Sequence, residues 1–429
     1  MENFTELYYQ RPYIQTFEAE VIACEKDEKG WQIELSQTAF YPEGGGQPAD
    51  IGSLLTVASE EDPLKTEIRD EAEKAVVHAD STDRVRITDV QKKQDRILHR
   101  ADRPLETGTK VRGVIDWERR MDHTQGHTGE HILSGIIHRR FGYENVGFHM
   151  NENLITIDIS GPLTWEELMI CEREANQVVQ SNLPVRELFP QGKELEELDY
   201  RSKKELEGIV RIIDIPGADT CACCGTHLMY TGEVGMIKAL SLMNYKKGVR
   251  IEMVCGRLAL QDYERKVEQN TEISRLLSAK PMETAAAVAR LKEEQSALNY
   301  RITEMADKYL ALRLEMIRRE LTSGSGDADN SSQICMVFES GIDNNSARRF
   351  CNEVLKEKLA PTAAVLIKKD NGNEPEYSYI IGTTEGNLRE KAKSLNSALN
   401  GRGGGSPEMI QGSFKSSEEK IREVLLHSF

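Results

Sequence analysis

The feature that most constrains the fold is a heptad repeat of apolar residues between about 288 and 316. Its spacings alternate between three and four over about four heptads, and one polar residue, Gln295, interrupts it. This pattern is typical of a coiled coil, or of a helical hairpin that packs on itself. We expect an oligomerisation helix or a rigid spacer here, not a catalytic element. The seam residues are Val288, Leu291, Gln295, Leu298, Ile302, Met305, Tyr309, Leu312 and Met316.

The helical segment separates parts of the chain that have different patterns. A chain of 429 residues is too long for one core and is expected to hold about three domains. Residues 1–117 carry short β-rich runs between Gly, Pro and Asp clusters, typical of a small β-barrel or sandwich, of which we favour the barrel. Residues 118–257 predict an α+β domain. Residues 258–321 are charged and helical with a break at Pro281, and residues 333–429 predict a compact α/β domain.

Composition narrows the class of protein. No apolar run approaches the ~20 residues that a membrane-spanning helix needs. The first residues, MENFTELYYQRPY, lack the basic and apolar regions of a signal peptide, so we expect a cytoplasmic enzyme without a membrane partner. The net charge of -16 argues against a general binder of duplex DNA, which needs a dominant basic surface. The stretch TSGSGDADNSS (322–332) has the composition of a flexible linker.

Residues 127 to 131 read HTGEH and place two histidines four positions apart. On a helix, His127 and His131 lie on one face, close enough to share a metal ion. The same letters fit His-x-x-Glu-His, the inverted zinc-peptidase signature, in which Glu130 would be the general base. Nine histidines scattered at random give such a pair in roughly one chain in six, so the motif alone is weak.

A second pair with the same spacing, Cys223 and His227 in CACCGTH, strengthens the metal interpretation. Together the two pairs offer three imidazoles and one thiolate, a set that suits tetrahedral zinc. Eight cysteines in a long chain without a secretion signal are not expected to form a disulfide framework, and cysteines clustered beside histidine indicate metal. Cys221 or Cys224 is an alternative ligand, but the spacing that mirrors the histidine pair favours Cys223.

The stretch TAFYPEGGGQPADIG (38–52) contains three consecutive glycines, which let a backbone bend freely and approach a ligand closely. It matches the dinucleotide-binding motif only formally, because no strand-turn-helix context surrounds it. No Gly-Lys-Ser/Thr of a P-loop is present. The stretch therefore predicts either a substrate loop or a corner of the barrel.

Four motifs carry a resemblance to a known family. FYPEGGGQPADIG, HTGEHILSG and CCGTHLMYTGEVGMIKA occur in this order. They are similar to the three motifs of the AlaX family, free-standing editing proteins related to the editing domain of alanyl-tRNA synthetase. The tail, GRGGGSPEMIQG, resembles the glycine-rich motif of the DHH-associated domain that closes both the synthetase and the long AlaX proteins. The resemblance covers nearly the whole chain.

The resemblance implies roles for individual residues. Gln47 and the glycines before it would line the editing pocket, and the Thr38 hydroxyl would recognise a misattached serine. Where the synthetase carries a glutamine after the metal helix, GFHM supplies Gly147 and nearby His149. This His149 either faces the pocket or is a structural histidine. This chain has CCGTH where the family commonly has CGGTH, so Cys224 replaces a glycine. The implied catalytic residues are Thr38, Gln47 and His149; the substrate-binding residues are Gly44, Gly45, Gly46 and Thr226; the zinc ligands are His127, His131, Cys223 and His227.

The implied activity is hydrolysis of the ester between an amino acid and the terminal ribose of tRNA. The substrate would be tRNA(Ala) mischarged with serine or with glycine. No aminoacylation domain is expected before residue 1, so the protein would deacylate in trans and not charge tRNA. Four protein ligands normally close a zinc site. Zinc is therefore expected either chiefly to position groups or to have one ligand displaced when substrate enters.

Two other functions compete with editing. One is a zinc peptidase that uses Glu130 as its base, and the other is a tRNA-binding scaffold without catalysis. Under the editing interpretation Glu130 is expected to be a helix-surface residue. The heptad seam or the C-terminal domain is expected to form a homodimer.

Overall fold

The computed structural model describes residues 6–10, 12–28, 30–57, 84–202, 210–323, 333–369 and 375–429. Its contacts divide the chain into two compact units, Met1–Gln269 and Asn270–Phe429. Both units mix helices and strands, so the predicted α+β class is confirmed. Of the predicted linker at 322–332, residues 324–332 lie outside the described residues. Within the described part of the chain, no helix is long and apolar enough to cross a bilayer.

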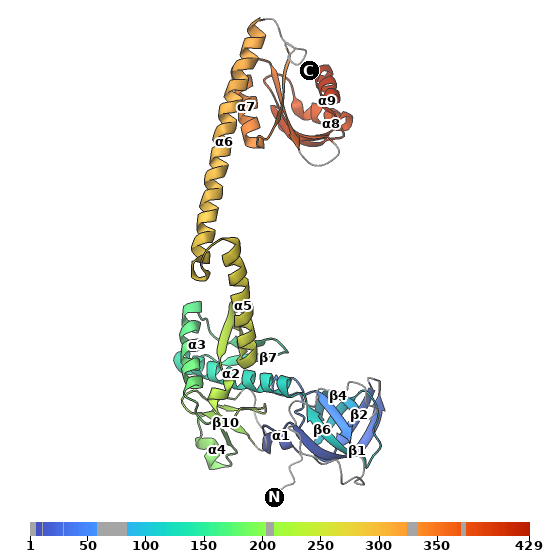
Figure 1. Ribbon diagram of the computed structural model, residues 1–429, viewed down its shortest axis with the longest axis vertical. Helices are drawn as coiled ribbons and strands as arrows, with labels where there is room; N and C mark the ends of the chain where they lie inside the picture. The colour runs from blue at the N-terminus through green and yellow to red at the C-terminus, as the bar shows by residue number, and fades with distance from the viewer. Residues whose placement is uncertain are drawn as a thin grey trace. The chain divides into compact units, whose positions relative to one another are not determined.

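The first unit contains a closed six-stranded barrel, as predicted (Figure 1). Its strands pair antiparallel in the order β1-β2-β5-β4-β3-β6, and the pairing of β1 with β6 closes the sheet so that no edge is left open. Alternate residues such as Val21, Ile33 and Val90 fill the interior. The elements are α1 (Leu7–Gln10), β1 (Thr16–Asp27), β2 (Gly30–Leu35), β3 (Gly52–Thr56), β4 (Arg84–Lys93), β5 (Arg96–Ala101) and β6 (Lys110–Ile115).

A long buried helix, α2 (Trp117–Phe141), follows the barrel and carries HTGEH. The side chain of Asp116 caps its first turn by accepting a hydrogen bond from the Arg119 amide. Gly142, in the left-handed conformation, ends it. The helix contacts α3, the four-stranded sheet and β11. Because it is enclosed by these elements, most of its polar residues are buried, and they need partners inside the protein.

Two antiparallel sheets and a second helix complete the first unit. The four-stranded sheet has the order β12-β13-β8-β7, and the three-stranded sheet has the order β11-β10-β9. A capping box of Thr164 and Glu167 begins α3. The elements are β7 (Asn145–Met150), β8 (Ile155–Ile159), α3 (Trp165–Gln180), β9 (Arg186–Leu188), α4 (Lys193–Glu197), β10 (Ile212–Ile215), β11 (Asp219–Ala222), η1 (Thr231–Val234), β12 (Ile237–Tyr245), β13 (Gly248–Cys255) and α5 (Gly256–Leu276).

In its described residues, the second unit holds the end of α5, the long helix α6, a five-stranded sheet and the helices α7, α8 and α9. The sheet order is β14-β15-β16-β18-β17, in which only the pair of β14 and β15 is parallel. The predicted break at Pro281 is confirmed, since it lies in a 3-10 turn before α6. The elements are η2 (Pro281–Glu283), α6 (Thr284–Ser323), β14 (Ile334–Ser340), α7 (Asn344–Lys356), β15 (Thr362–Lys369), β16 (Glu376–Thr383), α8 (Leu388–Ala398), β17 (Arg402–Gly405), β18 (Met409–Lys415) and α9 (Glu418–Ser428).

The predicted heptad seam lies along α6 and faces away from the core. Leu310 and Ile317 pack on the α7 side of the sheet and are buried. The apolar seam residues are all exposed, from 42% for Val288 to 70% for Met305. The helix itself is therefore confirmed, whereas a coiled-coil partner for it stays a prediction.

Candidate metal centre

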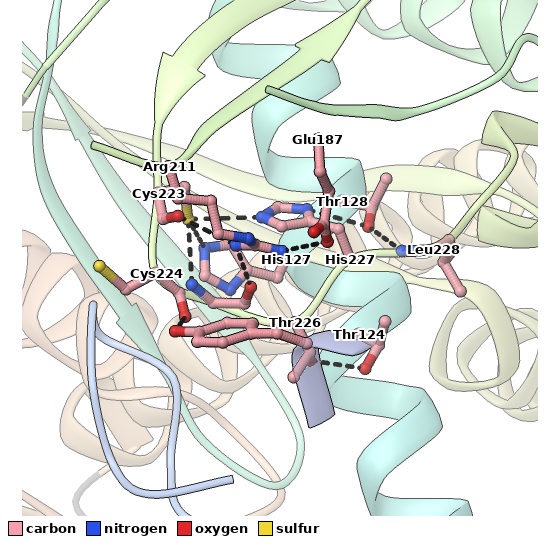
Figure 2. Close-up of polar contacts among 12 residues, drawn as sticks. Thr124, His127, Thr128, Glu187, Arg211, Cys223, Cys224, Thr226, His227 and Leu228 are labelled. Carbon is pink, nitrogen blue, oxygen red and sulfur yellow. Dashed lines mark hydrogen bonds and ion pairs between the residues drawn. The ribbon is translucent and has the colours of Figure 1, made fainter. Parts of the chain in front are cut away.

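The two predicted ligand pairs meet in the first unit. Figure 2 shows three of the four residues, His127, Cys223 and His227. One ligand atom from each of His127, His131, Cys223 and His227 lies within 4.8 Å of the others. The Cys223 sulfur is 3.4 Å from Nε2 of His127 and 3.3 Å from Nε2 of His227. Around one tetrahedral zinc, neighbouring nitrogen and sulfur ligands are separated by about 3.3 to 3.6 Å. The donor set and its spacing therefore fit a zinc ion.

All three histidines have a partner for the nitrogen that faces away from the cluster. Nδ1 of His127 bonds to Oε1 of Gln47 at 2.9 Å. Nδ1 of His131 bonds to Oδ2 of Asp219 at 2.9 Å, and Nδ1 of His227 lies 3.3 Å from the Thr128 hydroxyl. Such partners fix the ring orientation and the tautomer of metal-binding histidines. The arrangement leaves the three Nε2 atoms as the nitrogens available to an ion.

Electrostatics distinguish Cys223 from the two cysteines beside it. Burial raises the pKa of the Cys223 thiol, but the three imidazoles of the cluster more than offset this, so its pKa lies well below the ordinary value. Burial raises the pKa of Cys221 to about 11, and it also raises the pKa of Cys224. Cys224 points away from the cluster in Figure 2. Because the thiolate is the form that binds metal, Cys223 is the ligand that the site favours.

Asp219 joins the cluster to a partly buried arginine, Arg201. Its second oxygen, Oδ1, accepts a hydrogen bond from Nε of Arg201 at 2.7 Å, and Arg201 also bonds to the Ser134 hydroxyl. Burial alone raises the pKa of Asp219, but the hydrogen bonds from His131 and Arg201 lower it below the ordinary value. A charged carboxylate therefore holds His131 in place. Cys221 lies near His131 and Asp219. These three side chains form a second group that could hold an ion, but only by sharing His131 with the first group.

The loop between Cys223 and His227 is fastened to Gln47. The buried Gln47 amide donates to the Thr226 hydroxyl at 2.9 Å, and its carbonyl oxygen accepts from the Thr226 backbone at 3.1 Å. The Thr226 hydroxyl also bonds to Thr124 on α2. A Cβ on Gly225 would lie 2.0 Å from Cε1 of His127, so only glycine fits there. Gln47 and Thr226 are thus supports of the ligand loop, with their polar groups already paired.

Thr38, the expected discriminating residue, lies in the barrel interior. Its hydroxyl is 2.8 Å from Nε2 of His99 and accepts a hydrogen bond from the Phe40 amide. His99 Nδ1 bonds to the Ile33 carbonyl, which can only accept, so Nε2 is the acceptor and Thr38 donates to it. Burial lowers the pKa of His99 to about 4. The described contacts do not connect Thr38 to the metal cluster.

His149 lies on the face of β7 opposite to the one that contacts His127, and a place for it in the editing pocket stays a prediction. Alternation along β7 turns Phe148 toward the site, with its ring centre 4.9 Å from that of His127. His149 is exposed and lines a different cavity with Gly46 and Arg119. Gly46, with a φ of +86°, approaches Phe148 so closely that a Cβ would lie 2.5 Å from its ring. The glycine loop is a tight turn closed by two backbone bonds between Gly44 and Gln47.

Glu130 is buried, so the prediction that it lies on the helix surface is wrong. It is 1% exposed and accepts a hydrogen bond from the Asn145 side chain. The reason is that neighbouring elements enclose α2 on all sides, which a single helical motif cannot reveal. The interaction with Asn145 turns Glu130 toward β7. This arrangement does not suit a general base acting at the cluster, as the peptidase interpretation requires.

Several residues that support the cluster were not predicted from the sequence. Asp219 stands two positions before Cys221, and only its nearness to the cysteine cluster could have pointed to it. Arg211 donates to the carbonyls of Cys223 and Gly225 at 2.9 and 2.8 Å and so shapes the ligand loop. Its guanidinium also lies over the ring of Tyr9, 4.6 Å from the centroid. No spacing rule connects residues so far apart.

Comparisons with known proteins define the class. The "Threonyl and Alanyl tRNA synthetase second additional domain" matches residues 210–252, which include Cys223 and His227. The "DHHA1 domain" matches residues 330–427. The chain therefore carries an additional domain of synthetase type followed by a DHHA1 domain.

Individual relatives show which proteins the chain resembles along most of its length. The alanyl-tRNA editing protein AlaX-L of Pyrococcus horikoshii is 27% identical, over 98% of this chain and 97% of its own length. The alanine–tRNA ligase of Pyrococcus furiosus is 32% identical, over 98% of this chain but 43% of the ligase. The chain thus spans less than half of the ligase it matches. The resemblance to the long AlaX proteins, and to the editing and C-terminal domains of alanyl-tRNA synthetase, is confirmed.

Proposed function

We propose that this protein hydrolyses the ester of tRNA(Ala) mischarged with serine, in trans and without charging tRNA itself. The observation that carries the proposal is the four-residue metal cluster, half of which falls in the segment that matches the synthetase additional domain. The resemblance to an AlaX-L editing protein over 98% of the chain supports the same activity. We propose further that the protein removes misattached glycine from tRNA(Ala) and that it acts in the cytoplasm.

Zinc is the proposed ion, because three imidazoles and a thiolate match its preferences. When bound, it would fix the ligand loop against α2 and so position the groups around the site. The chain's own residues prepare this site: Gln47 orients His127, and Asp219 orients His131. We therefore assign Gln47 and Thr226 a positioning role, since the polar groups of both are already paired.

Thr38 is the proposed discriminator between serine and alanine. Its hydroxyl hydrogen is directed to His99 and one lone pair accepts from Phe40, which leaves one lone pair. A substrate serine would donate its hydroxyl to that lone pair, and alanine has no such group. Thr38→Val is expected to reduce the ratio of kcat/KM for seryl over alanyl ester by at least about tenfold. Ser53→Ala, another buried hydroxyl of the barrel, is the control, and an unchanged ratio in Thr38→Val would refute the role.

The deciding experiment is hydrolysis of Ser-tRNA(Ala), Gly-tRNA(Ala) and Ala-tRNA(Ala) by the zinc-loaded protein, with casein as a peptidase substrate. The variants are His131→Ala, which removes a ligand, and Glu130→Gln, which keeps the shape of a buried residue outside the cluster. Editing predicts cleavage of the seryl ester that is lost in His131→Ala and retained in Glu130→Gln. Casein cleavage lost in Glu130→Gln would establish a peptidase. Binding of tRNA without any hydrolysis would establish a scaffold.

We also propose that α6 pairs with a second copy of the chain along its exposed seam. An apolar stripe that continues over four heptads is stable in water when another helix covers it. The exposed side chains of Leu298, Ile302 and Met305 support this assignment.

A further inference from the structure

A cavity of about 560 Å³ opens beside the metal cluster in the first unit. It is lined by Tyr9, Gln10, Pro12, Tyr13, Ile14, Val185, Glu187, His227, Leu228 and Met229. His227 thus belongs both to the cluster and to the cavity wall. A group bound in this cavity would lie next to the position where an ester at the metal centre is cleaved.

The segment that forms one wall is fastened to the ligand loop at two points. Tyr9 donates its hydroxyl to the Cys224 carbonyl at 2.7 Å. The Tyr13 oxygen accepts from the Met229 amide at 2.9 Å, and its hydroxyl donates to Glu233. Because their hydroxyl groups are held in this way, the two rings have fixed positions. A wall built from rigid aromatic rings suits recognition of a flat ligand.

The cavity is larger, and its lining more aromatic, than a small amino-acid side chain such as that of serine requires. Its volume lies in the range of pockets that enclose drug-sized ligands, roughly 300 to 1,000 Å³. Its lining is mainly aromatic and apolar, and Glu187 is the one carboxylate among the residues that line it. Proteins recognise unpaired nucleotides by stacking the bases on aromatic side chains. A nucleobase with its ribose therefore suits the cavity better than the side chain of serine.

We propose that this cavity holds the terminal nucleoside of the aminoacyl-tRNA, with the rings of Tyr9 and Tyr13 as the surface for its base. The inference rests on the proposed esterase function, since it is the ester that brings this nucleoside to the cluster. Tyr13 and Tyr9 are thus assigned to binding, and the metal ligands to the reacting group. Recognition of the nucleoside and discrimination of the amino acid are then carried by different residues.

The test uses the full-length, zinc-loaded protein and a short RNA ending in cytidine-cytidine-adenosine, with 2-aminopurine in place of the terminal adenine. Stacking on tyrosine quenches this base, so binding is read without hydrolysis. Tyr13→Leu removes the ring and Tyr13→Phe keeps it. Tyr9→Leu and Tyr9→Phe form a second matched pair. Tyr263→Leu, an exposed ring on α5, is the control. Zinc content and tryptophan fluorescence establish that each variant is folded.

We expect the leucine variants to bind the RNA about 5- to 150-fold more weakly, the range of base stacking on an aromatic ring. Their KM for seryl-tRNA is expected to rise by a similar factor with kcat nearly unchanged. The phenylalanine variants keep the ring but lose its hydroxyl bond, and they are expected to weaken binding much less than the leucine variants do. Folded leucine variants with unchanged quenching and KM would overturn the proposal. A changed preference between serine and alanine at constant KM would also overturn it, because the cavity would then hold the amino acid. Quenching by the parent without hydrolysis would support the nucleoside site while refuting the esterase.

Discussion

The metal cluster in the first unit and the seam on α6 in the second were both predicted from residue spacing, yet the structure completes only one of them. Around the cluster, each of the three histidines has a buried partner within the chain. Along α6, the apolar seam residues remain exposed. The difference teaches that the metal site needs only the folded chain and an ion. The described chain supplies no surface that covers the seam, so the partner proposed for α6 would be another molecule.

The largest effect is expected from removing the thiolate of the cluster. Cys223→Ala should weaken zinc binding by well over the 10- to 100-fold that loss of a supporting partner costs. The measurement is zinc per chain after dialysis against a chelator, together with the thermal stability of the first unit. Cys224→Ala is the matched control, since this neighbouring thiol is exposed and points away. Equal zinc loss in both variants would mean that the cluster is not closed as described.

The next largest effect is expected at the exposed seam of α6. Leu298→Glu combined with Ile302→Glu places charges on the seam and should weaken self-association at least about 100-fold, because each buried side chain of this size contributes about 1.5 to 3 kcal/mol. Analytical ultracentrifugation of parent and variant measures this change. Tyr300→Glu, on the same helix but outside the seam, should leave association unchanged. A parent chain that is monomeric at high concentration would show that the seam serves another partner.

The sequence predicted elements and ligands well but failed where long-range packing decides. The barrel, α2 with its two histidines, and the long helix α6 each follow a local pattern and are present as expected. Cys223 and His227 could be added because their spacing repeats that of the first pair. The burial of Glu130 and the outward direction of His149 depend on which elements enclose α2 and β7. The role of Asp219 depends on its contact with His131 on α2, and that of Arg211 on its contacts with β9 and the ligand loop, which no spacing encodes.

A smaller effect concerns the partners that complete the cluster. Asp219→Asn keeps the shape of the side chain but removes the charge that holds His131, and it should weaken zinc binding about 10- to 100-fold. Competition with a fluorescent zinc chelator measures the affinity. Asp214→Asn, on the neighbouring strand β10, bonds to Thr220 instead and is the control. An unchanged affinity in Asp219→Asn would show that Arg201 and the fold alone orient His131.

The smallest effect is expected at the buried, hydrogen-bonded pair of Thr38 and His99 in the barrel. Burial lowers the pKa of His99 to about 4, below the ordinary 6.5, so its contribution to stability is complete above about pH 6.5 and is lost as the pH falls toward 4. Between pH 7.5 and 5.5 this loss amounts to about 1 to 2 kcal/mol of unfolding free energy.

Urea unfolding followed by tryptophan fluorescence measures this loss, because Trp31, Trp117 and Trp165 all lie in the first unit. His99→Gln has no imidazole to protonate there, so its stability should fall about 1 to 2 kcal/mol less than that of the parent over this pH range. The metal ligands titrate equally in both proteins and cancel in the difference. His427→Gln, an exposed histidine of the second unit, should behave as the parent does. Identical pH dependence in His99→Gln and the parent would mean that His99 takes up its proton in the folded state, so that the barrel does not enclose this pair.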